Sequence, residues 1–124
     1  MPSSAVDAYA AAERVTSSGR QLEASVLFRV ARGLQVAQEQ WGTPGYQSRV
    51  EAALKQNQKL WTFFQAELAE PENPLPADLK ASLGRLIEFI DRRTFEMMAF
   101  PAPEKLSILI NINRNVGAGL AAQP

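Results

Sequence analysis

The sequence predicts an all-α fold: a small antiparallel bundle of four main helices, preceded by a weaker N-terminal helix. Large apolar residues recur at spacings of three and four over most of the chain, which is the period of an amphipathic helix. No run alternates with a period of two for long enough to indicate a strand. The breaks between the periodic segments are short, and short connections favour antiparallel neighbours. We therefore expect residues 1–124 to form a single domain.

The weak first helix is predicted over about Ala5–Thr16. Ser4 followed by Asp7 fits a capping box, in which side chains satisfy backbone donors at a helix start. The segment consists mostly of alanine, which favours helix formation but buries little apolar area. Ser17–Gly19 is expected to end it. We therefore expect this helix to dock weakly on the rest of the bundle.

The second helix is predicted from about Gly19 to Gln40. Phe28 points nearly opposite to its apolar stripe, so it is either covered by the first helix or exposed as an anchor for a partner. The stripe consists of Leu22, Val26, Val30, Leu34, Ala37 and Trp41.

A turn rich in Gly and Pro, residues 41–45, precedes a third helix that extends to about Ala69. The corner Pro71–Pro76 follows, where the prolines exclude a helix interior. One face of the helix carries Val50, Leu54, Asn57, Trp61, Phe64 and Leu68, and Leu60 and Phe63 widen it.

Pro76 is well placed as the first residue of a fourth helix, which ends at about Ala99. Its predicted core face carries Leu79, Leu83, Leu86, Ile87, Ile90, Thr94, Met97 and Met98, with Phe89 and Phe95 at the margins. A last helix begins at about Pro103 and carries Leu106, Leu109, Ile112, Asn113, Val116 and Leu120 on one side.

Asn57 and Asn113 each interrupt an apolar stripe. A buried amide without a hydrogen-bond partner destabilises a fold by about 2 kcal/mol. We expect the two amides to hydrogen-bond to each other or to nearby backbone, and so to set the register of their helices. Direct contact with a binding partner is the alternative.

The composition excludes several classes of function. Thirteen basic residues balance thirteen acidic ones, so the chain lacks the positive excess used in binding nucleic acid or anionic membranes. The absence of Cys and His removes thiolate or imidazole zinc sites and Ser–His or Cys–His catalysis. The apolar runs are shorter than a membrane span, and no signal peptide is evident. We expect a cytoplasmic protein that is not an enzyme and uses no cofactor or metal.

Several large apolar residues lie at the margins of the predicted helix faces. Exposed Phe and Met beside a helix groove suit the capture of a partner's amphipathic helix, and core packing is the alternative. The candidate partner-binding residues are Phe28, Leu60, Phe63, Phe89, Phe95 and Met98. The arginine clusters, Arg29 with Arg32 and Arg85 with Arg92 and Arg93, are interpreted as solvated helix faces.

Three groups of residues together resemble the FlaF family of flagellar biosynthesis regulators. They are Asn57-Gln58-Lys59-Leu60-Trp61-Thr62, the corner Pro71-Glu72-Asn73-Pro74-Leu75-Pro76, and Ile112-Asn113-Arg114 with Gly119-Leu120. Ala8-Tyr9-Ala10 and Arg20-Gln21-Leu22-Glu23-Ala24 resemble the start of that family. The similarity covers nearly the whole chain in the same order. The motif residues that it marks as structural are Asn57, Trp61, Pro74, Pro76, Asn113 and Arg114.

The resemblance implies a cytoplasmic protein of flagellated alphaproteobacteria: a flagellin-binding secretion chaperone and regulator of flagellin synthesis. Such a protein would hold an amphipathic flagellin helix in an apolar groove, with the weak first helix as a mobile wall over Phe28. Flagellin and an FlbT-like regulator are the implied partners. The alternative is a post-transcriptional regulator of flagellin mRNA, acting on RNA or through the FlbT-like partner. The neutral charge argues against direct binding of nucleic acid.

Overall fold

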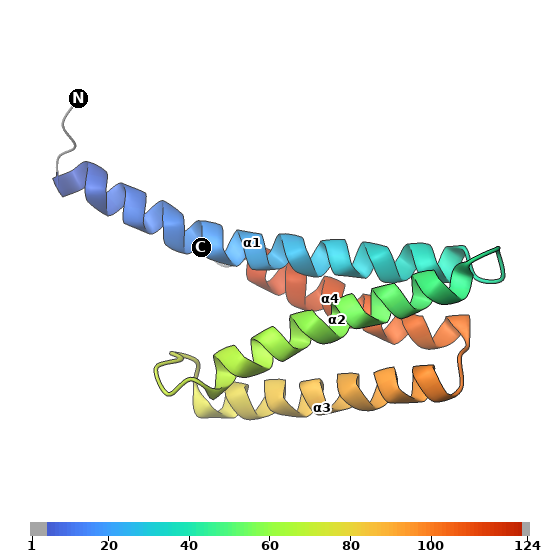
Figure 1. The fold of residues 1–124 in the computed structure, drawn as a ribbon. Helices are drawn as coiled ribbons and strands as arrows, with labels where there is room; N and C mark the ends of the chain where they lie inside the picture. Colours follow the sequence, from blue (N-terminus) through green and yellow to red (C-terminus); the bar gives the residue numbers. More distant parts are fainter. Residues whose placement is uncertain (1–4, 123–124) are drawn as a thin grey trace.

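The computed structural model describes the backbone of residues 5–122 and the side chains of residues 21–122 (Figure 1). Within that range the chain is helical and contains no strand, so the predicted all-α class with four main helices is confirmed. The helices are α1 (Ala5–Glu39), α2 (Tyr46–Ala69), α3 (Ala77–Ala99), the short 3-10 helix η1 (Pro103–Lys105) and α4 (Leu106–Ala121).

The first two predicted helices form one continuous helix, so the predicted break at Ser17–Gly19 is wrong. α1 runs without interruption from Ala5 to Glu39. Ser and Gly have only modestly unfavourable helix propensities, and the strong helix formers on both sides outweigh them.

The first half of α1 projects away from the bundle (Figure 1). Each residue of a helix adds about 1.5 Å along the axis, so Thr16 lies roughly 18 Å from Phe28 along the same rod. A segment continuous with α1 does not fold back over Phe28. The predicted mobile wall is therefore wrong for this arrangement.

The core is formed by α1, α2 and α4, together with Ile87, Ile90 and Met97 of α3. α1 and α4 form the most extensive pairing, and α3 packs mainly against α2. The connections between successive helices lie at alternate ends of the bundle, and α3 runs along its outer edge (Figure 1). Because α3 packs mainly against one neighbour, its apolar residues Leu79, Phe95 and Met98 are exposed.

The buried face of α1 differs from the predicted stripe. Leu22 was expected in the core but is 64% exposed. Short side chains are buried on this face instead, because α1 and α4 approach closely. A Cβ added at Gly117 of α4 would lie only 3.1 Å from the ring of Phe28 on α1. The buried residues of α1 are Ala24, Leu27, Val30, Ala31, Leu34 and Ala37.

The predicted face of α2 is observed, with Phe64 and Leu68 partly buried at its end. On α3 the predicted core face is buried from Ile87 to Met97, whereas Leu79 and Met98 are exposed. Pro76 is the N-cap of α3 and not its first residue. The buried residues are Val50, Ala53, Leu54, Asn57, Leu60 and Trp61 on α2, and Ile87, Ile90, Thr94 and Met97 on α3.

Asn73 holds the corner between α2 and α3. Its side-chain Nδ2 donates to the carbonyl oxygen of Glu67 at 3.0 Å, and its Oδ1 accepts from the backbone N–H of Leu75 at 3.0 Å. Its own backbone N–H donates to Glu70 at 3.0 Å. The corner is thus fixed by the hydrogen bonds of Asn73 and by Pro74, whose ring fixes its backbone φ angle.

Candidate functional site

A hydrogen-bonded chain of three side chains joins α2 to α4 inside the bundle. Asn113 Nδ2 donates to Asn57 Oδ1 at 2.7 Å, and Trp61 Nε1 donates to Asn113 Oδ1 at 2.9 Å. The hydrogen bond expected between the two asparagines is therefore present. The indole N–H can only donate, so it determines which amide atom of Asn113 faces Trp61 and which faces Asn57.

This network is structural. Asn57 and Asn113 are both 0% exposed, so in this arrangement neither touches a binding partner. Asn57 Nδ2 is buried and has no hydrogen-bond partner in the described part of the chain. Sliding α4 along α2 would break both hydrogen bonds and bury further unpaired groups, which supports a role in helix register. On the outer surface of α4, Arg114 donates a hydrogen bond to Gln35 Oε1 of α1.

An open apolar groove lies between α2 and α3, at the end of the bundle where α1 turns into α2. We call it the Trp41 groove; its volume is about 260 Å³. Gln47 and Glu51 are its polar members. The apolar lining consists of Trp41, Tyr46, Val50, Leu54, Met97, Met98 and Pro101.

The turn between α1 and α2 places two aromatic rings at the mouth of this groove. The ring centroids of Trp41 and Tyr46 are 5.2 Å apart. Gly42 and Gly45, which stand between them in the chain, have φ values of 83° and 79°. Glycine adopts this left-handed backbone without steric cost, so the turn is tight enough to bring the two rings together.

Large apolar side chains lie exposed beside the groove. Met98 lines it and is 53% exposed, and Phe95, one helical turn earlier on α3, is 74% exposed. Phe100, next to Pro101, is exposed to a similar degree. Several such side chains at one place are typical of a surface that binds another protein.

The structure separates the six candidate partner-binding residues. Met98 lines the Trp41 groove, and Phe95, one helical turn earlier on α3, is exposed but is not part of the lining. Phe89 is half-buried, with the guanidinium of Arg93 5.6 Å from its ring centroid. Leu60 is buried in the core, so its predicted place at the edge of a groove is wrong.

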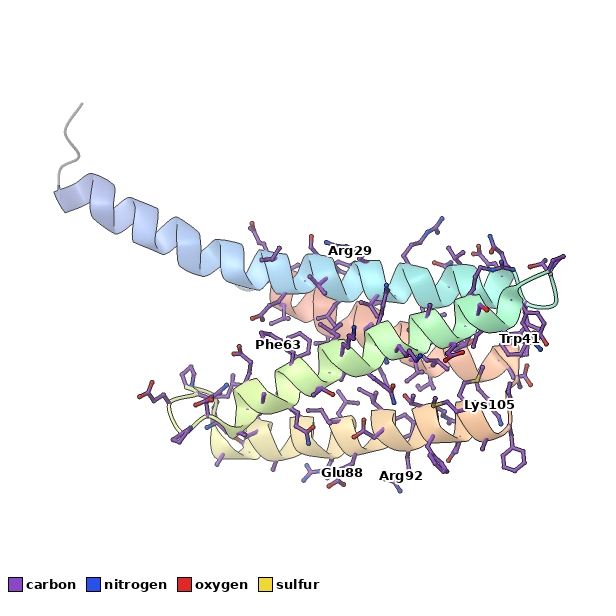
Figure 2. All side chains as sticks on the ribbon, in the orientation of Figure 1. Arg29, Trp41, Phe63, Glu88, Arg92 and Lys105 are labelled. Atoms are coloured by element: carbon purple, nitrogen blue, oxygen red, sulfur yellow. The ribbon has the colours of Figure 1, made fainter. Side chains whose placement is uncertain are left out.

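Phe28 and Phe63 are partly exposed but lie elsewhere. The ring of Phe28 packs at Gly117 of α4. Phe63 and Trp41 lie toward opposite ends of the bundle (Figure 2). The six candidates therefore do not form one groove, and only Met98 lines the Trp41 groove.

Of the residues that line the groove, only Met98 was among the candidates. The two aromatic lining residues that were missed are Trp41 and Tyr46. Trp41 was interpreted as the end of a core stripe. The signal that would have found them is the pair of aromatic residues on either side of a turn containing two glycines. Such a turn brings the residues that flank it close together in space.

The basic residues do not form one surface. Arg29 lies on α1 and Arg92 on α3, at opposite edges of the molecule (Figure 2). The ion pairs Lys55–Glu51 and Arg93–Glu96 are local to their helices. In the described range no group of acidic residues is arranged to hold a metal ion. Among the described helices, none combines the length and apolar character needed to cross a membrane.

A comparison with protein families matches residues 5–120 to the family described as flagellar protein FlaF. The matched range contains the three-residue network, the corner at Asn73 and the Trp41 groove. No curated protein and no solved structure shows significant similarity to the chain.

Proposed function

We propose that this chain, which belongs to the FlaF family of flagellar proteins and so has a role connected with the flagellum, is a secretion chaperone for flagellin. In this proposal the Trp41 groove holds an amphipathic helix of flagellin until export. The fraction of the protein that is bound then depends on the amount of flagellin not yet exported. Through this dependence the protein also influences flagellin synthesis and flagellar assembly.

The observation that carries the proposal is the exposed apolar surface around the Trp41 groove. An amphipathic helix binds by inserting apolar side chains at successive turns into such a groove. Methionine adapts to different guest side chains, because its unbranched side chain is flexible and polarizable. Met98 supplies such a side chain from α3, and Trp41 and Tyr46 supply aromatic rings to the same groove.

The length of the groove supports a moderate affinity. Its α2 wall runs from Tyr46 to Leu54, which is about 12 Å at the rise of an α-helix. A guest helix would place about two turns in the groove, and therefore two or three apolar anchors. Each anchor contributes roughly 1–2 kcal/mol when it is removed from water. Binding of that strength protects the guest and still allows release at the export apparatus.

The test is a calorimetric titration of purified flagellin into the wild type and into Met98→Asp and Phe95→Asp variants. We expect Met98→Asp to weaken binding about tenfold or more, because it places a charge in an apolar contact. Both side chains are more than half exposed, so the thermal unfolding of the free protein should not change. Leu79→Asp is the control, since Leu79 is exposed at the other end of α3.

Two outcomes would contradict the proposal. If the wild-type protein does not bind flagellin, the proposed chaperone function is wrong. If Met98→Asp and Phe95→Asp bind flagellin as the wild type does, the Trp41 groove is not the binding site.

The RNA-binding alternative is tested by fluorescence anisotropy with the flagellin mRNA leader. Direct binding of RNA requires a continuous basic surface, and its affinity falls steeply with added salt. Arg29 and Arg92 lie at opposite edges of the molecule, so we expect no such binding (Figure 2). Salt-sensitive RNA binding at micromolar protein would favour the alternative.

A further inference from the structure

The end of the bundle away from the Trp41 groove carries a second apolar surface, where α2 ends and α3 begins. It is a hollow of about 150 Å³ lined mainly by Phe64, Leu68, Leu75, Leu83, Val116 and Leu120. A shallower depression that contains the half-exposed Phe63 adjoins it, and Glu67 and Asn73 line both. We call the two together the acidic hollow.

The rim of this surface is negatively charged. Between Lys59 and Lys80 the sequence contains Glu67, Glu70, Glu72 and Asp78 but no Lys or Arg. Glu67, Glu70 and Glu72 line the hollow and are exposed.

The carboxylates of Glu67, Glu70 and Glu72 are available to an incoming cation. The ion pairs found among residues 21–122 join Lys55 to Glu51 and Arg93 to Glu96, and none involves these three glutamates. Lys80, the nearest cation along α3, is half-buried in its first turns and forms no ion pair with them. The hollow therefore presents an apolar floor and, next to it, carboxylates that are not paired with cations of the described residues.

We propose that the acidic hollow binds an amphipathic segment of a partner protein that carries Lys or Arg beside its apolar side chains. The apolar side chains enter the floor between Leu68 and Leu83, and the cations contact Glu67, Glu70 and Glu72. Complementary charge orients the segment and speeds its association. The same carboxylates repel RNA and anionic membranes, so a basic protein segment is the occupant that the charge selects.

The geometry allows the acidic hollow and the Trp41 groove to be occupied together. Val50 in the groove and Ala66 in the hollow are separated by about 24 Å along α2. Phe63 and Trp41 lie toward opposite ends of the bundle (Figure 2). The acidic hollow therefore gives the protein a second interaction surface, distinct from the one proposed for flagellin.

The rim of the hollow is held in place before a partner arrives. The side chain of Asn73 bonds to the last turns of α2 and to Leu75, at 3.0 Å in each case. These bonds fix the corner that presents Glu70 and Glu72. A preformed rim loses little conformational entropy on binding, which favours affinity.

The experiment measures the fluorescence anisotropy of two labelled synthetic helical peptides, with the same Leu and Ala pattern and either Lys or Glu at the flanking positions. We expect the Lys peptide to bind at least tenfold more tightly than the Glu peptide. Replacing the three rim residues (E67Q, E70Q and E72Q) should weaken binding of the Lys peptide about tenfold, because exposed charge pairs each contribute modestly. Phe63→Ser should weaken both peptides, since Phe63 is part of the apolar surface.

The matched control removes three exposed acidic charges elsewhere, by E39Q, E88Q and D91N. This control should bind the Lys peptide as the wild type does. Equal weakening by both triple variants would show that only net charge matters and would overturn the proposal. Equal binding of the Lys and Glu peptides would also overturn it.

Two further readouts separate this proposal from its alternatives. Met98→Asp should leave binding of the Lys peptide unchanged; a loss would place the peptide in the Trp41 groove and overturn the proposal, while flagellin binding would still be judged by its own titration. Sedimentation velocity tests whether the occupant is a second copy of this chain. Self-association that the three rim substitutions abolish would assign the hollow to that copy and overturn the proposal.

Discussion

The buried hydrogen-bonded chain of Trp61, Asn113 and Asn57 leads to an unusual prediction. After Asn113 is replaced, a second substitution at Asn57 should raise the free energy of unfolding. Asn113 stands in the middle, donating to Asn57 at 2.7 Å and accepting from Trp61 at 2.9 Å. Asn113→Leu removes both hydrogen bonds and leaves Trp61 Nε1 and Asn57 Oδ1 unpaired. Adding Asn57→Leu then removes the unpaired amide of Asn57 as well.

The magnitudes follow from the number of unpaired buried groups. Each one costs about 1–3 kcal/mol, whereas replacing both members of a pair by apolar groups is nearly neutral. Asn113→Leu creates two such groups, so we expect it to lower the free energy of unfolding by about 3 kcal/mol. The double variant keeps only Trp61 Nε1 unpaired and also loses Asn57 Nδ2, which has no partner in the wild type. It should therefore be more stable than Asn113→Leu alone, by about 1–2 kcal/mol.

The assay is urea unfolding followed by circular dichroism at equilibrium, on the wild type, both single variants and the double variant. Leucine is larger than asparagine, so a parallel set with alanine distinguishes crowding from lost hydrogen bonding. The coupling between positions 57 and 113 should have the same sign in both sets. A double variant that is less stable than Asn113→Leu, by the full cost of Asn57→Leu, would refute the reasoning.

Other predictions concern α1 and its crossing with α4. Gly119→Ala should raise the free energy of unfolding by about 0.5–1 kcal/mol through helix propensity. The free energy of unfolding of Gly117→Ala, measured in urea, should be at least about 1 kcal/mol lower than that of Gly119→Ala. The new Cβ at Gly117 would lie 3.1 Å from the Phe28 ring, whereas a Cβ at Gly119 meets nothing within 4 Å. Equal stabilities of the two variants would contradict the close crossing of α1 and α4. Deleting residues 1–20 should shift thermal unfolding by less than about 2 °C and leave flagellin binding unchanged, since this part of α1 projects away from the bundle (Figure 1). Weaker flagellin binding after the deletion would show that the segment forms part of the binding site.

The sequence predicts α2 and its inner face well, because large apolar residues recur there at one clear helical period. It also identifies Asn57 and Asn113, since an amide within an apolar stripe needs a partner. Trp61 as the third member was not predicted. Whether the indole of Trp61 reaches the amide of Asn113 depends on how α2 and α4 are rotated and shifted relative to each other. The spacing of apolar residues within one helix carries no information about that.

Two errors in α1 have related physical causes. The predicted stripe began at Leu22, whereas the buried face of α1 includes Ala24, Leu27 and Ala31. Short side chains are buried there because α1 and α4 approach closely at Gly117. The predicted break at Ser17–Gly19 gave local turn preference more weight than the helix formers on both sides.

The candidate site was predicted in kind but not in place. Phe95 and Met98 were expected at the edge of a groove; both are exposed, and Met98 lines the Trp41 groove. Leu60 was placed with them on the margin of the α2 face, but the rotation of α2 turns it into the core. The acidic hollow was not anticipated, because its floor comes from segments far apart in the chain.

The central claim is that flagellin covers the Trp41 groove, and methionine methyl groups report on it most directly. The chain has three methionines, so a sample labelled with ¹³C at the methionine methyls gives a spectrum simple enough to assign by substitution. On titration with flagellin we expect the Met98 signal to shift and broaden strongly, and the signal of the buried Met97, which also lines the groove, to shift less. Bound flagellin that leaves both signals unmoved would contradict the claim.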